Sequence, residues 1–210
     1  MRVRPVSVEN LVQELTDLLI CREPDNHLRV ALDGAPAAGP GTLADALVGP
    51  LRARGRPTVR IDTADFLRAA SLRLEFGRDN PDSYYLGWFD EAGLAREVLG
   101  PAGPGGSGRV LAKLWNAATD RAAREPYLDL PAGAILLVSG PLLLGGGLTF
   151  DVSVHLEMSA AALARRTPAE DAWTLPAFER YAEEVAPASF ADVVVRVDDP
   201  RHPALVLASG

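Results

Sequence analysis

The chain has 210 residues, of which 48% are hydrophobic, so it is long enough to bury the core of one α/β domain and is not disordered as a whole. Its formal net charge of −7 argues against a nucleic-acid or anionic-membrane partner, because both need a basic surface. Cys21 is the only cysteine, which excludes an internal disulfide and favours a reducing cytoplasm.

The first segment of the chain predicts a helix. Ser7 is typical of a helix N-cap, and Leu11, Leu15 and Leu18 follow it at helical spacing. We therefore expect residues 1–26 to form an N-terminal helical extension.

An apolar strand and a second helix come next. HLRVALD, residues 27–33, predicts a strand, and the following helix is expected to begin near Pro40 or Gly41. We expect this helix to be interrupted or kinked at Gly49–Pro50, because proline removes a helical hydrogen bond. TVRID, residues 58–62, predicts another short strand.

The middle of the chain is rich in turn-forming residues. Residues 70–108 contain FGRDNPDSYYLGWFD and GPAGPGGSG, so we expect irregular structure there. A long segment of this kind is typical of a functional lid or binding segment. LAKLWNAATDR, residues 111–121, predicts a helix, or a strand leading into one.

Residues 130–150 carry no charged side chain, which raises the question of a membrane span. Pro131, Pro141 and several glycines interrupt this stretch, and such interruptions favour a buried strand, a turn and a second apolar stretch. The unbroken apolar run GAILLVS, residues 133–139, is typical of a central strand in a parallel sheet. We therefore expect no membrane partner.

The last part of the chain alternates strands with helices. DVSVHLEM, residues 151–158, predicts a strand, and Ser159 is expected to cap a short helix after it. LPAFERYAEEVAPASF, residues 175–190, predicts a helix, and ADVVVRV, residues 191–197, predicts a further strand. The alternation predicts a doubly wound parallel sheet with flanking helices, in a single domain over residues 1–210.

Metal and serine-hydrolase chemistry find little support in the sequence. The three histidines, His27, His155 and His202, fall in no metal-ligand spacing, so they predict no metal site. Ser139 ends a predicted central strand, but its surroundings lack the G-x-S-x-G turn that exposes a nucleophile.

The segment GAPAAGPGT, residues 34–42, joins a predicted strand to a predicted helix. Gly34 and Gly39 have the spacing of the phosphate loop G-x-x-x-x-G-K-[ST], and the strand–loop–helix context agrees with it. Pro40 stands in the lysine position, however, and an ordinary turn also explains the segment taken alone. The candidate phosphate-loop residues are Gly34, Gly39, Gly41 and Thr42.

Several further segments have a specific order and spacing. They are LADAL after the loop, RARGRPTVRID leading to ADF, GRDNPDSYY, FDEAGL, LGPAGPGG, AGAILLVSGPLLL, FDVSVHLEMSAAALARR and FADVVVRVDDPRHP. With these segments, from residue 28 to 204, the chain resembles the uridine kinase family, in particular its bacterial uridine kinase-like branch. The resemblance implies a P-loop kinase-like three-layer α/β/α fold and transfer of the γ-phosphoryl group of ATP to the 5′-hydroxyl of uridine or cytidine.

The resemblance also assigns roles on the acceptor side. Residues 66–108 would form an acceptor-side insert, in which Asp79 matches the aspartate that receives the ribose hydroxyls. Tyr84 and Trp115 would offer stacking surface for a base, although packing explains such aromatic residues as well. Arg121 lies near the family's basic contact to the pyrimidine ring.

Two departures from the family pattern lie in the loop itself. The family's lysine falls on Pro40, which removes a cation and a backbone N–H. The hydroxyl that holds Mg²⁺ falls on Gly41, and Thr42 stands one residue late, about 100° around the helix.

Two further departures concern acidic residues. The family's catalytic aspartate falls on Ala64, which leaves Asp62 and Asp65 as the neighbouring candidates for a catalytic carboxylate. The acid that closes the next central strand and helps to hold magnesium falls on Ser139.

The lid-like segment, residues 165–190, also departs from the family pattern. Glu170 and Asp171 stand where the family carries an Arg-Asp pair, so acids replace the cation that would meet ATP. Arg165 and Arg166 are candidates for a substitute phosphate clamp, because arginine binds phosphate through two hydrogen bonds.

Three interpretations remain open. In the first, the chain is a pseudokinase that keeps the fold and binds a nucleoside or another small molecule. In the second, it is an active phosphotransferase that uses arginines as a phosphate clamp, with ATP and Mg²⁺ as cofactors by family resemblance. In the third, it is a structural or regulatory partner, or a homo-oligomer. A cytoplasmic location is expected in each case.

Overall fold

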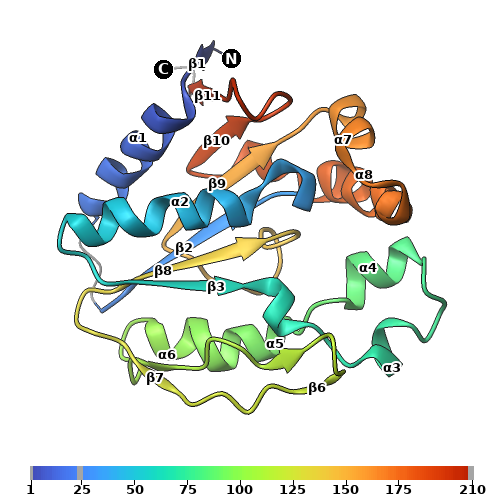
Figure 1. The fold of residues 1–210 in the computed structure, drawn as a ribbon, viewed down its shortest axis with the longest axis horizontal. Helices are drawn as coiled ribbons and strands as arrows, with labels where there is room; N and C mark the ends of the chain where they lie inside the picture. The colour runs from blue at the N-terminus through green and yellow to red at the C-terminus, as the bar shows by residue number, and fades with distance from the viewer. Residues whose placement is uncertain (1, 23–25, 208–210) are drawn as a thin grey trace.

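A seven-stranded sheet lies at the centre of the computed structural model, which describes residues 2–22 and 26–207 (Figure 1). Its strand order is β1-β11-β10-β9-β2-β8-β3. The strands from β10 to β3 run parallel, and β11 pairs antiparallel with both β10 and β1. The bounds are β1 Arg2–Pro5, β2 Leu28–Asp33, β3 Thr58–Asp62, β8 Ile135–Gly140, β9 Val152–Glu157, β10 Val193–Arg196 and β11 Ala204–Leu207.

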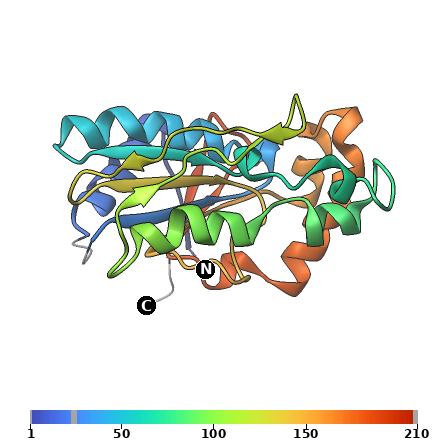
Figure 2. The same ribbon diagram turned by 90° about the horizontal axis from the view of Figure 1, so that it is seen from below.

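Helices cover both faces of the sheet (Figures 1 and 2). On one face lie α1 (Val8–Ile20) and α2 (Pro40–Ala53). On the other lie α5 (Glu91–Leu94), the π-helical turn η3 (Ala95–Leu99) and α6 (Gly100–Ala102). The predicted α/β fold with a mostly parallel sheet and three layers is confirmed.

The other helices gather at the edge of the sheet where the parallel strands end (Figure 1). They are α3 Ala70–Arg73, α4 Pro81–Gly87, α7 Ala160–Arg166 and α8 Leu175–Glu184, with the short 3₁₀ segments η1 Pro36–Ala38, η2 Thr63–Phe66, η4 Ala169–Thr174 and η5 Pro187–Ser189. Two small antiparallel ladders lie apart from the main sheet: β4 (Arg109–Val110) pairs with β7 (Leu128–Asp129), and β5 (Trp115–Asn116) pairs with β6 (Arg121–Ala122).

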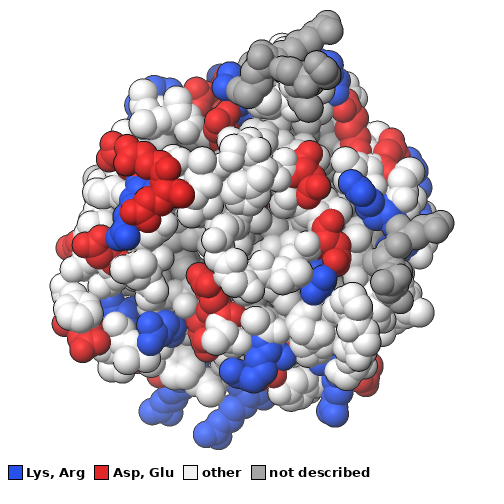
Figure 3. All heavy atoms as spheres, turned by 180° about the vertical axis from the view of Figure 1, so that it is seen from behind, with Lys and Arg blue, Asp and Glu red and all other residues white. Residues whose placement is uncertain are grey.

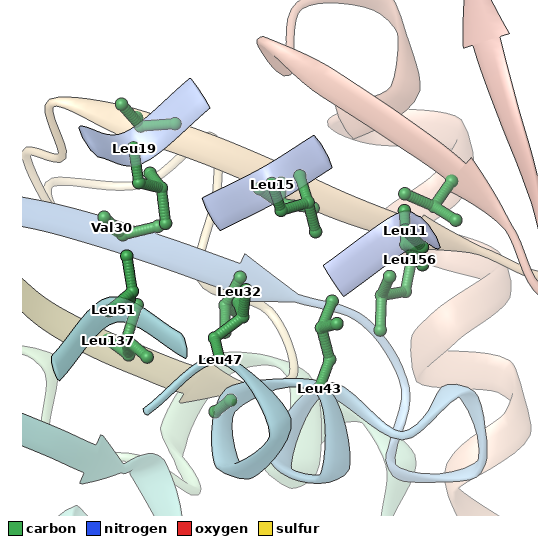
Figure 4. Close-up of a cluster of buried hydrophobic side chains, with 14 of the residues drawn as sticks. Leu11, Leu15, Leu19, Val30, Leu32, Leu43, Leu47, Leu51, Leu137 and Leu156 are labelled. Carbon is green, nitrogen blue, oxygen red and sulfur yellow. The ribbon is translucent and has the colours of Figure 1, made fainter. Parts of the chain in front are cut away.

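The central strand β2 explains the arrangement of the core. All six of its residues are buried, because helices cover the sheet on both sides. Val30 and Leu32 belong to the hydrophobic cluster under α1 and α2, and Ala31 belongs to the cluster on the other face, as alternation along a strand requires. Figure 4 shows the helix side chains that converge on β2: Leu11, Leu15 and Leu19 from α1, and Leu43, Leu47 and Leu51 from α2.

Most local predictions are confirmed by the structure. The Asn10 N–H donates to Ser7 Oγ over 3.2 Å, and the Ala162 N–H donates to Ser159 Oγ over 3.3 Å, so both serines cap helices. Strands are present in each of the predicted segments 27–33, 58–62, 133–139, 151–158 and 191–197.

Some local predictions were wrong. The helix α2 is not interrupted at Gly49–Pro50 but continues to Ala53. Pro50 lies in its last turn, where the missing N–H costs one hydrogen bond while Leu47 and Leu51 keep the helix packed on the sheet. The segment 70–108 contains the short helices from α3 to α6. Residues 111–121 contain β5 and the first residue of β6, so the predicted strand is present there, but no helix follows it. Residues 2–5 form a strand, which pairs with β11 at the sheet edge.

The surface carries both kinds of charge. Figure 3 shows the face opposite that of Figure 1, where acidic and basic side chains are mixed and the basic ones gather along the lower edge. None of the helices in the described part of the chain combines the length and the apolar character that crossing a membrane requires.

An ion pair between a buried arginine and a partly exposed aspartate ties the start of β2 to the residue before β9. Arg29 is 7% exposed, and its Nε and Nη2 donate to Asp151 Oδ2 and Oδ1 over 3.0 and 2.7 Å. The Arg29 backbone N–H also donates to Asp151 Oδ2, over 2.8 Å. Burial raises the pKa of Asp151, but the hydrogen bonds from Arg29 outweigh it, and the net shift is downward.

We expect Asp151→Asn to lower the free energy of unfolding by roughly 3 kcal/mol at neutral pH, because it leaves the Arg29 cation buried without a counter-charge. Since the folded state lowers the pKa of Asp151, its contribution is complete above the carboxyl's ordinary value of 3.8 and is lost as the pH falls through the lower folded value. Urea denaturation across pH measures this difference.

The exposed pair Arg4–Glu14 supplies the control, and Glu14→Gln should change stability far less. An Asp151→Asn variant as stable as the parent at neutral pH would contradict the role of this pair.

Candidate functional site

The carboxyl ends of β2, β3 and β8 meet where α2 begins, and a cavity of about 390 Å³ opens there. We call it the cleft. The loop after β2, the residues after β3, the end of β8 and aromatic residues of and after α4 surround it. It is lined by Pro36, Gly39, Pro40, Gly41, Thr42, Asp62, Thr63, Ala64, Leu67, Tyr84, Trp88, Phe89, Ser139, Gly140 and Pro141.

The loop of residues 34–42 is closed on itself. Gly39 has a left-handed φ of 79°, which favours glycine, and it stands immediately before α2. The Ala38 N–H donates to the Ala35 carbonyl over 2.8 Å, and the Gly39 N–H donates to the Pro36 carbonyl over 3.0 Å. Pro36 and Pro40 have no N–H. Among the described residues, the loop N–H groups outside backbone hydrogen bonds are those of Ala35 and Ala37 and those of Gly41 and Thr42 in the first helical turn.

Arg60 is the cation beside this loop, and the sequence analysis did not identify it. Its Nη2 lies 3.0 Å from Asp62 Oδ2, and its Nε lies 2.9 Å from Asp45 Oδ1. A Cβ added to Gly41 would lie 2.8 Å from Arg60 Nη2, so the absence of a side chain at Gly41 leaves room for the guanidinium.

One signal in the sequence was available for this arrangement. Arg60 and Asp62 are two residues apart on β3 and therefore share one face of the strand. What the sequence does not reveal is that α2 contacts β3, which brings Gly41 and Asp45 to the same place.

The candidate carboxylates are both engaged in the structure. Asp62 lines the cleft, pairs with Arg60 and accepts a hydrogen bond of 2.9 Å from the Ala64 N–H. Asp65 lies 2.7 Å from Lys113 Nζ and is not among the residues that line the cleft. No cluster of three His, Cys, Asp or Glu side chains that could hold a metal ion occurs within residues 2–22 and 26–207.

Ser139 is a buried polar residue of the cleft without a partner. It is the last residue but one of β8, is fully buried, and its Oγ has no hydrogen-bond partner among the described residues. Leaving a buried hydroxyl unpaired costs free energy, so an occupant of the cleft that bonds to it would gain from the contact.

The structure separates the four candidate nucleoside contacts. Tyr84 lines the cleft and packs with Trp88 and Trp173, each with a ring-centroid distance of 5.5 Å. Trp115 and Arg121 lie on the β5–β6 ladder, where Trp115 Nε1 donates to Asp120 Oδ1. Asp79 is exposed in the turn before α4. Of the four, only Tyr84 reaches the cleft.

The two candidate clamp arginines bond to backbone carbonyls. Arg165 Nη1 donates to the Ala161 carbonyl of its own helix over 3.2 Å, and Arg166 Nη1 donates to the Val197 carbonyl over 3.0 Å. Neither lines the cleft, but Arg166 lines a smaller cavity of about 180 Å³ together with Gly39 and Thr42.

Solved structures share this architecture. The structure of "a Possible Uridine Kinase from Bacillus stearothermophilus" has a TM-score of 0.73 and 19% identity, over 89% of this chain and 98% of that one. A "putative fructose transport system kinase from Silicibacter sp. TM1040" has a TM-score of 0.60 and 24% identity, over 90% of this chain and 98% of that one. The YGR205w protein has a TM-score of 0.58 and 12% identity, over 97% of this chain and 100% of that one.

The comparisons by sequence find no counterpart. No protein-family model matches the chain, and no curated protein does. At these levels of identity the structural likeness establishes the fold, and the chain has the three-layer α/β/α fold of P-loop kinases.

Proposed function

We propose that this protein is a uridine kinase-like pseudokinase, which binds a nucleoside or a similar small molecule in the cleft and does not transfer phosphoryl groups from ATP and Mg²⁺. The observation that carries the proposal is the position of Arg60, which occupies the space beside Gly41 and neutralises Asp62. Phosphoryl transfer depends on a free cation and a metal at the phosphates, and this space is where they would be needed.

The residues of the cleft do not fit a magnesium ion. Mg²⁺ prefers oxygen ligands, and carboxylates above all. The Asp62 carboxylate is held by Arg60 and by the Ala64 N–H, and Gly41 offers no side-chain oxygen. The other side-chain oxygens of residues that line the cleft are the hydroxyls of Thr42, Thr63, Tyr84 and Ser139, which carry no charge to hold the ion. We therefore assign no step of a reaction to a metal.

The cleft suits a neutral ligand with a planar ring and hydroxyl groups. Its volume of about 390 Å³ falls within the range of small-molecule sites. Tyr84 and Trp88 provide aromatic surface for a ring. Ser139 Oγ and Asp62 provide polar atoms for hydroxyls, as a nucleoside requires.

An active phosphotransferase is the second candidate, and the observation that favours it is Arg166 beside Gly39 and Thr42. It predicts a phosphorylated product from a panel of nucleosides, sugars and vitamins with ATP and Mg²⁺. Arg166→Ala should then abolish that activity. Absence of product over the whole panel would eliminate this candidate.

Ser139→Ala separates a binding role of the hydroxyl from a structural one. Because Ser139 Oγ is buried and unpaired, we expect the variant to be as stable as the parent or more stable. Its affinity for uridine should fall about fivefold, because one hydrogen bond to the ligand is lost. Isothermal titration with uridine and a urea denaturation curve measure the two effects.

The same titration tests the proposal as a whole. Added ATP and Mg²⁺ should neither change uridine affinity nor yield ADP. Uridine turnover, or unchanged uridine affinity in both Ser139→Ala and Trp88→Ala, would contradict the proposal.

The contact between Gly41 and Arg60 has its own test by a double-mutant cycle. In the parent protein, Gly41→Ala should gain little stability or lose some, since the new methyl group displaces Arg60 from Asp62. In an Arg60→Ala background, the same change should stabilise α2 by up to about 1 kcal/mol, because alanine is the better helix former. Urea denaturation of the four proteins gives the coupling free energy, and purely additive effects would show that Arg60 does not occupy this space.

A further inference from the structure

A second cavity lies on the other side of the loop after β2. It has a volume of about 410 Å³ and lies between the end of β9, α7, α8 and η5, elements that Figure 1 places together at the carboxyl edge of the sheet. We call it the α8 cavity. It shares no lining residue with the cleft. Its walls are mostly apolar and include Leu156, Met158, Leu163, Phe178, Ala182 and Pro187.

A buried carboxylate stands behind one wall of the α8 cavity. Asp33, the last residue of β2, has no exposed surface, and His155 is its direct neighbour on β9. Asp33 Oδ2 lies 2.7 Å from His155 Nδ1 and accepts a hydrogen bond of 3.1 Å from the Tyr181 hydroxyl. Asp33 Oδ1 accepts a hydrogen bond of 2.9 Å from the Leu143 N–H.

These contacts fix the orientation of the histidine ring. Burial and the charge of Asp33 raise the pKa of Tyr181, so its phenol keeps its proton and donates to Asp33. An ionised carboxylate only accepts hydrogen bonds, so the network assigns a proton to His155 Nδ1. When Nδ1 alone carries a proton, the lone pair of the ring is on Nε2, which hydrogen-bonds to no described residue.

The charges around His155 Nε2 favour a ligand that donates a hydrogen bond to this atom. His155 is 9% exposed and lines the α8 cavity. The charged side chains around it are acidic: Asp33 lies behind the ring, and Glu157 lines the same wall. Arg196 pairs with Glu157 at 2.8 Å and thereby balances it. An anion would face the carboxylate of Asp33, whereas an O–H or N–H group presents its positive end to the lone pair.

We infer that the α8 cavity is a second small-molecule site, for an apolar or aromatic molecule with one hydroxyl or N–H group, as in phenols and indoles. The apolar walls hold the body of the ligand, and its polar group donates to His155 Nε2. The inference is independent of the cleft and of the function proposed for it.

Three probes of similar size test the inference: phenol, anisole and benzoate. Phenol can donate a hydrogen bond, anisole cannot, and benzoate is an anion. The chain has three histidines, so nuclear magnetic resonance can follow the ring signals of each one separately. We expect phenol to shift the ring signals of His155 and not those of His27 or His202. Phenol should bind about five- to tenfold more tightly than anisole, the worth of one hydrogen bond, and benzoate more weakly than either.

Two variants complete the design. Ala182→Leu fills the cavity without touching the Asp33–His155 contact, so it should weaken phenol and anisole alike and leave uridine binding unchanged. His155→Phe should abolish the preference of phenol over anisole. If the His155→Phe variant fails to fold because Asp33 loses a partner, the three probes and the Ala182→Leu variant still test whether the α8 cavity binds the ligand. Unshifted His155 signals, equal affinity for phenol and anisole, or tighter binding of benzoate would overturn the inference.

Discussion

The central strand β2 is fully buried and carries Arg29 near its start and Asp33 at its end, and the fold depends on the partners of these two side chains. Arg29 meets Asp151 just before β9, and Asp33 meets His155 on β9 itself. A buried charge without a partner is costly, so these pairs fix how β2 lies against β9. The loop after Asp33 and the two cavities on either side of it take their positions from this arrangement.

The core and the cleft depend on different residues. Leu43, Leu47 and Leu51 hold α2 to the sheet and lie in the hydrophobic cluster, whereas Gly41 and Thr42 face the cleft. The likeness to solved kinase structures concerns this shared scaffold. At the start of α2, the lack of a side chain at Gly41 makes room for Arg60.

Local rules were sufficient to predict much of the fold. The serine caps and the central strands follow from residue type and periodicity, and their order predicts the parallel sheet. The two-residue strands and the short helices α3 and α4 escaped prediction, because segments of this length carry no clear period and take their shape from tertiary contacts. The helical run of α5, η3 and α6 escaped it because Gly93, Gly100 and Pro101 are residues typical of turns.

The candidate site was less predictable than the fold. The loop and Asp62 could be placed at the cleft from the sequence, since both follow predicted parallel strands. Asp79, Trp115 and Arg121 were proposed from family resemblance, and the structure puts them outside the cleft lining. The Asp33–His155 contact joins residues 122 positions apart, and no spacing rule connects such a pair.

A crystal structure grown with ATP, MgCl₂ and uridine tests the central claim most directly. The account predicts uridine in the cleft and an intact Arg60–Asp62 contact with no nucleotide beside Gly41, whereas ATP phosphates bound at Gly39–Thr42 with Arg60 displaced would contradict it.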